Sequence, residues 1–133
     1  MIYIPKYFKL SELLVTDTGL INTPSWEAIV NLSILCEHVL DPLRIAFKRP
    51  IHVNSGFRTP DINKAIGGAK NSQHCLGMAS DITAGDDKMN KELFELILSS
   101  GIVFDQLIDE KQYTWIHISY NPVHNRKQIL HLN

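Results

Sequence analysis

The chain has 133 residues, of which 44% are hydrophobic and 20% are charged, and its formal net charge is -1. This length and composition are typical of one compact globular domain and exclude a two-domain enzyme, a disordered chain and a collagen-like repeat. Because 13 Lys and Arg residues are balanced by 14 Asp and Glu residues, the chain has no broad positive field for nucleic acid or anionic lipid. We therefore expect a single domain over residues 1–133, a monomer that binds neither nucleic acid nor membrane and recognises its partner locally.

Neither the cysteines nor the N-terminus has the pattern of an exported protein. The two cysteines, Cys36 and Cys75, are too few for a disulfide framework, and we expect reduced thiols. The first ten residues lack a basic segment followed by an apolar run and a small-residue cleavage site. No apolar stretch reaches the roughly 20 residues that a membrane-spanning helix requires. We expect a chain that is synthesised in the cytoplasm without a signal peptide.

The first part of the chain has the pattern of a helix. Residues 8–13 indicate a short extra turn before it. Thr23 can cap the main helix, and Pro24 suits its first position. Apolar residues then recur at three- and four-residue spacing: Trp26, Ile29, Val30, Leu32, Leu35, Cys36, Val39 and Leu40. We expect Pro42 to bend or end this helix.

The rest of the chain alternates short strands with a second helix. The strand candidates are residues 51–54, 79–83, 103–109 and 114–120. A helical pattern separates the second from the third, and the last two are expected to form an antiparallel hairpin. This order predicts an α+β fold in which helices pack on a small antiparallel sheet.

Three residues have the pattern of a catalytic metal site. His74 lies in a glycine-containing loop, Asp81 follows on a strand candidate, and His117 lies on a separate strand candidate. Zinc binds imidazole nitrogen and carboxylate oxygen, and three protein ligands leave a fourth position for water. On spacing alone, a single histidine on a strand is more often a hydrogen-bonded or surface residue, so spacing leaves both interpretations open.

The chain carries its motifs in a fixed order: Ser-Gly-Phe-Arg at 55–58, Asn63, Ser-x-His-x-x-Gly-x-Ala-x-Asp at 72–81, and Trp-Ile-His at 115–117. Together they resemble the M15-type zinc peptidases, which cut D-amino-acid-containing peptides of bacterial cell walls. The resemblance covers about residues 8–120. Within the family, it points more specifically to the small single-domain members found in phages and bacterial genomes. It implies a D-Ala-D-Ala peptidase/Hedgehog-like fold and a Zn²⁺ ion bound by His74, Asp81 and His117.

The resemblance leaves the general base open. Hydrolysis needs a carboxylate that takes a proton during attack and passes it to the leaving amine. In several members of the family an acid stands a few residues before the last histidine, but Tyr113 and Thr114 occupy those places here. Glu110 could reach the site across the hairpin, and Asp109 is the alternative. A solvated charge on the hairpin is the non-catalytic interpretation of Glu110.

Two further residues are candidates for contact with the substrate. The planar guanidinium of Arg58 can hold a carboxylate or stabilise a developing oxyanion, so we assign it a catalytic and a substrate-binding role. A surface salt bridge is the alternative, and the similarity to the family's Ser-Gly-Tyr-Arg motif favours the first interpretation. Ser72 either binds the peptide backbone or only caps its loop. Cys75 is interpreted as a packing residue, since no Cys/His catalytic pattern accompanies it.

These residues and the resemblance predict a hydrolase, a zinc metallopeptidase that cuts amide bonds in peptidoglycan stem peptides as a D-Ala carboxypeptidase or an endopeptidase. The alternative is a zinc-containing module without catalysis that binds the cell wall or forms part of a virion, and the missing acid before His117 supports it. A chain made in the cytoplasm acts on the wall only after release or delivery. A phage or prophage endolysin meets this condition.

Overall fold

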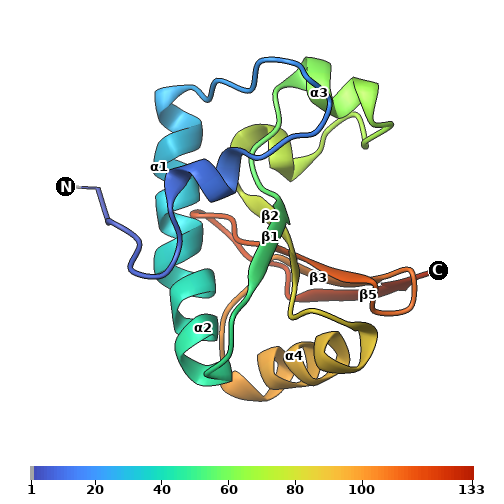
Figure 1. Ribbon diagram of the computed structural model, residues 1–133. Helices are drawn as coiled ribbons and strands as arrows, with labels where there is room; N and C mark the ends of the chain where they lie inside the picture. The colour runs from blue at the N-terminus through green and yellow to red at the C-terminus, as the bar shows by residue number, and fades with distance from the viewer. Residues whose placement is uncertain (1) are drawn as a thin grey trace.

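The computed structural model describes residues 2–133 as a central sheet with helices packed around it (Figure 1). The longer helices are α1 (Trp26–Leu35), α2 (Asp41–Phe47), α3 (Pro60–Ala65) and α4 (Asp87–Ser100). Shorter turns are the 3₁₀ helices η1 (Leu10–Leu14) and η3 (Gln73–Leu76) and the π-helical turn η2 (Cys36–Leu40). The strands are β1 (His52–Ser55), β2 (Ala79–Thr83), β3 (Gln106–Glu110), β4 (Trp115–Ser119) and β5 (Gln128–Leu132). The predicted α+β class is confirmed.

The predicted first helix carries three labels in the structure, because α1, η2 and α2 follow one another without a loop and form one column in Figure 1. Ser25 rather than Thr23 caps α1, and its hydroxyl accepts from the backbone N–H of Ala28 at 3.1 Å. Pro42 does not end the column. A π-turn precedes it, and Pro42 then lies in the first turn of α2, so the column continues past the proline.

The sheet has the strand order β1-β2-β4-β3-β5. The four predicted strands are paired antiparallel to their neighbours, and β3 and β4 form the expected hairpin. The fifth strand, β5, was not predicted, and it pairs parallel to β3 at the edge, so the sheet is mixed. The strand predicted over residues 103–109 begins later, at Gln106.

The two faces of the sheet have different environments. One face packs against the helices and contributes Ile82, Leu107, Ile116 and Ile118, each fully buried, to the hydrophobic core. The opposite face carries the residues that alternate with them along the strands, and no helix layer covers it. Among residues 2–133 no helix is both long and apolar enough to cross a membrane.

Candidate metal centre

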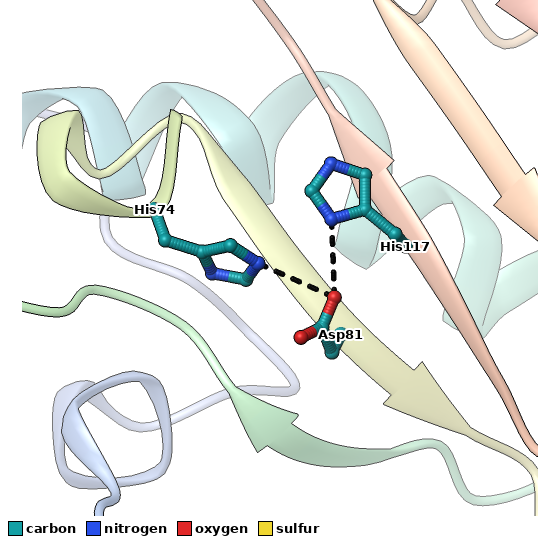
Figure 2. Close-up of side chains that lie close together, drawn as sticks. All are labelled: His74, Asp81 and His117. Carbon is teal, nitrogen blue, oxygen red and sulfur yellow. Dashed lines mark hydrogen bonds and ion pairs between the residues drawn. The ribbon is translucent and has the colours of Figure 1, made fainter. Parts of the chain in front are cut away.

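Three separate elements bring His74, Asp81 and His117 together on the uncovered face of the sheet (Figure 2). His74 lies in η3, while Asp81 on β2 and His117 on β4 are direct partners in the strand register. Asp81 Oδ1 lies 3.3 Å from His74 Nε2 and 3.1 Å from His117 Nδ1. A tetrahedral zinc with bonds of about 2.0–2.1 Å places its ligand atoms about 3.3 Å apart, so this spacing fits the ion.

The hydrogen bonds of His74 leave one ring nitrogen available to a metal. Nδ1 lies 2.6 Å from the carbonyl oxygen of Gly56 and donates to it, so Nε2 carries the lone pair. His74 is 2% exposed, and its Nε2 has no hydrogen-bond partner within residues 2–133. A buried acceptor without a partner is costly, whereas a metal-bound histidine usually donates its other N–H to a carbonyl or carboxylate. The residues present therefore fit a zinc ion.

The electrostatics of Asp81 also suit a ligand. Burial by itself raises the pKa of its carboxyl, but the adjacent imidazoles of His117 and His74 outweigh this and hold the pKa well below its usual range. Its second oxygen, Oδ2, accepts from Arg58 Nη2 at 3.2 Å. The carboxylate is therefore ionised, as metal binding requires, and its two oxygens serve different partners.

Arg58 lies beneath the cluster and is not a surface residue. Its side chain is 11% exposed, and the guanidinium donates to Ser55 Oγ, Asn63 Oδ1 and Asp81 Oδ2. Gly68 packs against this arrangement, because a Cβ at Gly68 would lie 2.0 Å from Asn63 Oδ1. Arg58 is thus held against the candidate ligand Asp81 by a salt bridge that is largely buried and not on the surface. Gly68 was missed as a site residue, although the Gly-Gly pair at 67–68 marks the loop.

Two motif glycines allow close backbone contacts around His74. A Cβ at Gly56 would lie 2.4 Å from the carbonyl oxygen of Leu13, and the carbonyl of Gly56 itself holds His74. Gly77 has φ +74°, and a Cβ there would lie 2.4 Å from the carbonyl oxygen of Ala28. A larger residue at either position would displace the backbone that carries or orients the histidine.

An open cleft of about 1070 Å³ lies over the cluster. Its walls come from residues 15–17, β1, residues 66–73 and the uncovered face of β3 and β4. His74, Asp81 and His117 all line it. This volume is ample for a peptide-sized ligand.

The structure separates the two candidate general bases. Glu110 pairs with Trp115 in the register, lines the cleft and accepts from Trp115 Nε1 at 3.1 Å. Asp109 points to the opposite face, where it is 6% exposed and accepts from the backbone N–H of Tyr113. Of these two carboxylates only Glu110 faces the cleft.

The remaining candidates lie on the loop that carries His74. Ser72 caps η3, and its hydroxyl accepts from the backbone N–H of His74 at 3.2 Å while still lining the cleft. Burial raises the pKa of the Cys75 thiol, so it remains protonated and is poorly suited to act as a nucleophile. Gln73 was not singled out from the sequence, yet its side chain donates to Asp105 Oδ2 at 2.9 Å across the cleft wall. No sequence motif marks this contact.

Comparison with known proteins supports the predicted resemblance. The family model described as Peptidase M15 matches residues 6–119. The zinc D-Ala-D-Ala carboxypeptidase of Streptomyces albus G is 51% identical to this chain over 37 residues. That match covers 28% of this chain and 14% of the relative, so it spans far less than two thirds of the relative's length. The expected resemblance to zinc peptidases is thereby confirmed.

Proposed function

Because the chain belongs to the peptidase M15 family, we propose that it is a zinc-dependent peptidase that hydrolyses amide bonds in peptidoglycan stem peptides. The observation that carries the proposal is the His74, Asp81 and His117 cluster, with the unpartnered Nε2 of His74, at the base of an open cleft. Three protein ligands are typical of catalytic rather than structural zinc sites. The similarity to the zinc D-Ala-D-Ala carboxypeptidase of Streptomyces albus G supports this substrate class.

The residues of the cleft have complementary roles in the proposed reaction. When bound, zinc would act as a Lewis acid and would lower the pKa of a coordinated water toward about 7. The Glu110 carboxylate takes the proton of the attacking water and passes it to the leaving amine. Arg58 holds Asp81 in place, and two of the five N–H groups of its guanidinium are still available to the carbonyl oxygen of the substrate. Ser72 has a hydroxyl hydrogen that it can donate to the peptide backbone.

Mass spectrometry of reaction products tests this proposal. Purified stem peptides and whole peptidoglycan are incubated with the zinc-loaded protein, beside a chelator-treated sample and the Glu110→Gln variant. Loss of one D-alanine identifies a carboxypeptidase, and internal fragments identify an endopeptidase. Bound zinc without either product across several wall types refutes the peptidase and leaves the non-catalytic wall-binding or virion module.

We also propose a role in phage or prophage lysis, because an enzyme that cuts stem peptides weakens the wall wherever it reaches it. The zinc-loaded protein is added to cells whose outer barrier has been permeabilised, and turbidity is recorded. A fall in turbidity that the chelator abolishes supports the lytic role. Cleavage of purified peptides without any effect on cells would contradict it.

A further inference from the structure

A second arginine, Arg126, lines the cleft, and it lies outside the residues 6–119 that the family model matches. Asp105, which is 2% exposed, fixes it. Arg126 Nε donates to Asp105 Oδ1 at 3.0 Å, Nη2 donates to Oδ2 at 2.8 Å, and the backbone N–H donates to Oδ1 at 2.9 Å. Gln73 completes the set at Oδ2. The carboxylate therefore holds the guanidinium along one edge in a bidentate pair.

The other edge of the same guanidinium is available to a ligand. Asp105 uses the edge formed by Nε and Nη2, and no acceptor within residues 2–133 takes the hydrogens of Nη1 or the second hydrogen of Nη2. The Arg126 side chain is 51% exposed, whereas the Arg58 side chain is 11% exposed and has three bonds to protein groups. The free pair of N–H groups has the planar geometry that matches a carboxylate.

Asp105 also keeps the pair charged and rigid. Its hydrogen bonds with Arg126 hold the pKa of the Asp105 carboxyl at about 2. The anchored guanidinium loses little conformational freedom when a ligand binds, which favours affinity. Lys111, another cation of the cleft, lies beside Glu110 at the far end of β3, so it does not duplicate the position of Arg126.

The strand register sets the distance between Arg126 and the metal cluster. Asp105 immediately precedes Gln106, the first residue of β3, and Ile108 lies opposite His117. Asp105 is thus three residues before Ile108, and three residues of extended chain span about 10 Å. The residue that anchors Arg126 therefore lies about three residues of extended chain from the register position of His117.

We propose that Arg126 is the substrate-carboxylate anchor of the cleft, which binds a free carboxylate of the peptide about three residues from the bond that is cut. This inference rests on the proposed function. A stem peptide offers such a group at the α-carboxylate of its γ-linked D-glutamate if the terminal D-alanine is removed, and at its terminal D-alanine if an internal bond is cut. Both groups are carboxylates that the guanidinium can bind in the same way, and the experiment distinguishes between them.

The test uses one synthetic peptide, L-Ala-γ-D-Glu-L-Lys-D-Ala-D-Ala, in three forms: both carboxylates free, the terminal carboxylate amidated, and the D-glutamate α-carboxylate amidated. Binding to the zinc-loaded protein is measured by calorimetry, and products are followed in the same samples by mass spectrometry. The variants are Arg126→Met, Arg126→Lys and the control Lys127→Met. Lys127 is exposed and adjacent, so its variant removes a positive charge without removing the planar donor pair.

We expect one of the two amidated peptides to bind the wild-type protein at least about tenfold more weakly than the free acid, since charge-assisted hydrogen bonds are lost. Arg126→Met abolishes this difference, Arg126→Lys retains part of it, and Lys127→Met retains all of it. The amidated form that loses affinity identifies which carboxylate is bound.

Equal binding of all three peptides to the wild-type protein, or no binding of any, overturns the inference. So does an equal loss of affinity for acid and amide forms in Arg126→Met, because that pattern indicates a structural role. If Arg126→Met does not fold, the binding of the three peptides to the wild-type protein and to Arg126→Lys still tests the inference. Preferential binding without cleavage supports the anchor and refutes the peptidase, whereas cleavage of all forms with equal KM refutes only the anchor.

Discussion

The adjacent glycines Gly67 and Gly68 provide a direct test of how the metal centre is supported. A Cβ at Gly68 would lie 2.0 Å from Asn63 Oδ1 and 3.0 Å from Arg58 Nη1. A Cβ at Gly67 meets nothing within 4 Å, but Gly67 has φ +75°, a conformation that strains other residues. Gly68→Ala therefore perturbs the support of the site, and Gly67→Ala perturbs only the backbone.

The expected losses of stability are similar in size but differ in origin. In Gly68→Ala the Asn63 carboxamide must move by about 1 Å or more to restore van der Waals separation. This breaks its bond with the charged Arg58, at 3.0 Å, and its bond to the carbonyl of Ala69, at 2.8 Å. These two bonds contribute about 2–4 kcal/mol to the free energy of unfolding. In Gly67→Ala the left-handed conformation costs about 1–2 kcal/mol.

Zinc affinity distinguishes the two variants. Once Asn63 moves, Arg58 is no longer fixed against the proposed ligand Asp81, and loss of such a supporting contact lowers metal affinity about 10- to 100-fold. Zinc affinity is measured by competition with a chromophoric chelator, and stability by urea denaturation of the same samples. We expect weaker zinc binding in Gly68→Ala and wild-type zinc binding in Gly67→Ala. Wild-type zinc affinity in Gly68→Ala, or an equal loss in both variants, would refute this account of the site.

Three further predictions concern catalysis, alkaline pH and the first helix. Glu110→Gln lowers kcat by about 10²-fold or more and leaves the zinc content unchanged. Asp109→Asn lowers thermal stability and leaves kcat near the wild-type value. The opposite pattern would show that Asp109 and not Glu110 is the general base. The hydrogen bond to Asp41 raises the pKa of Tyr3 to about 12, so the stability it contributes is complete below pH 10 and is lost as the pH rises from about 10 toward 12. Tyr3→Phe should flatten this part of the stability profile measured by circular dichroism. Ser25→Ala costs about 1 kcal/mol of unfolding free energy in urea denaturation, and no change would contradict its capping role.

The parts of the fold that could be predicted from sequence are those with a local signal. The hairpin was predicted because apolar residues mark both β3 and β4. β5 has no such signal: its residues are mostly exposed, without a buried alternation, and its pairing with β3 depends on distant contacts. A long-range parallel pairing of this kind leaves no periodic pattern in the sequence.

The candidate site shows the same division between local and long-range information. The cluster of His74, Asp81 and His117 was predicted from motifs, and the structure brings the three residues together. Sequence left Asp109 and Glu110 as alternatives, because adjacent strand residues face opposite sides and only the register with β4 says which side is the cleft. The environment of Arg58 could not be predicted from the sequence either, since it depends on Asp81, which is distant along the chain.

The division of the sheet into a packed face and a cleft face has a consequence for engineering. Neighbouring residues of β3 and β4 belong alternately to the core and to the cleft, so cleft positions other than Glu110 and His117 can be varied for substrate preference without disturbing the core. Gln106, Ile108 and Trp115 line the cleft and make no contribution to the main hydrophobic cluster. A combinatorial library limited to these three positions would sample new specificities on an intact scaffold.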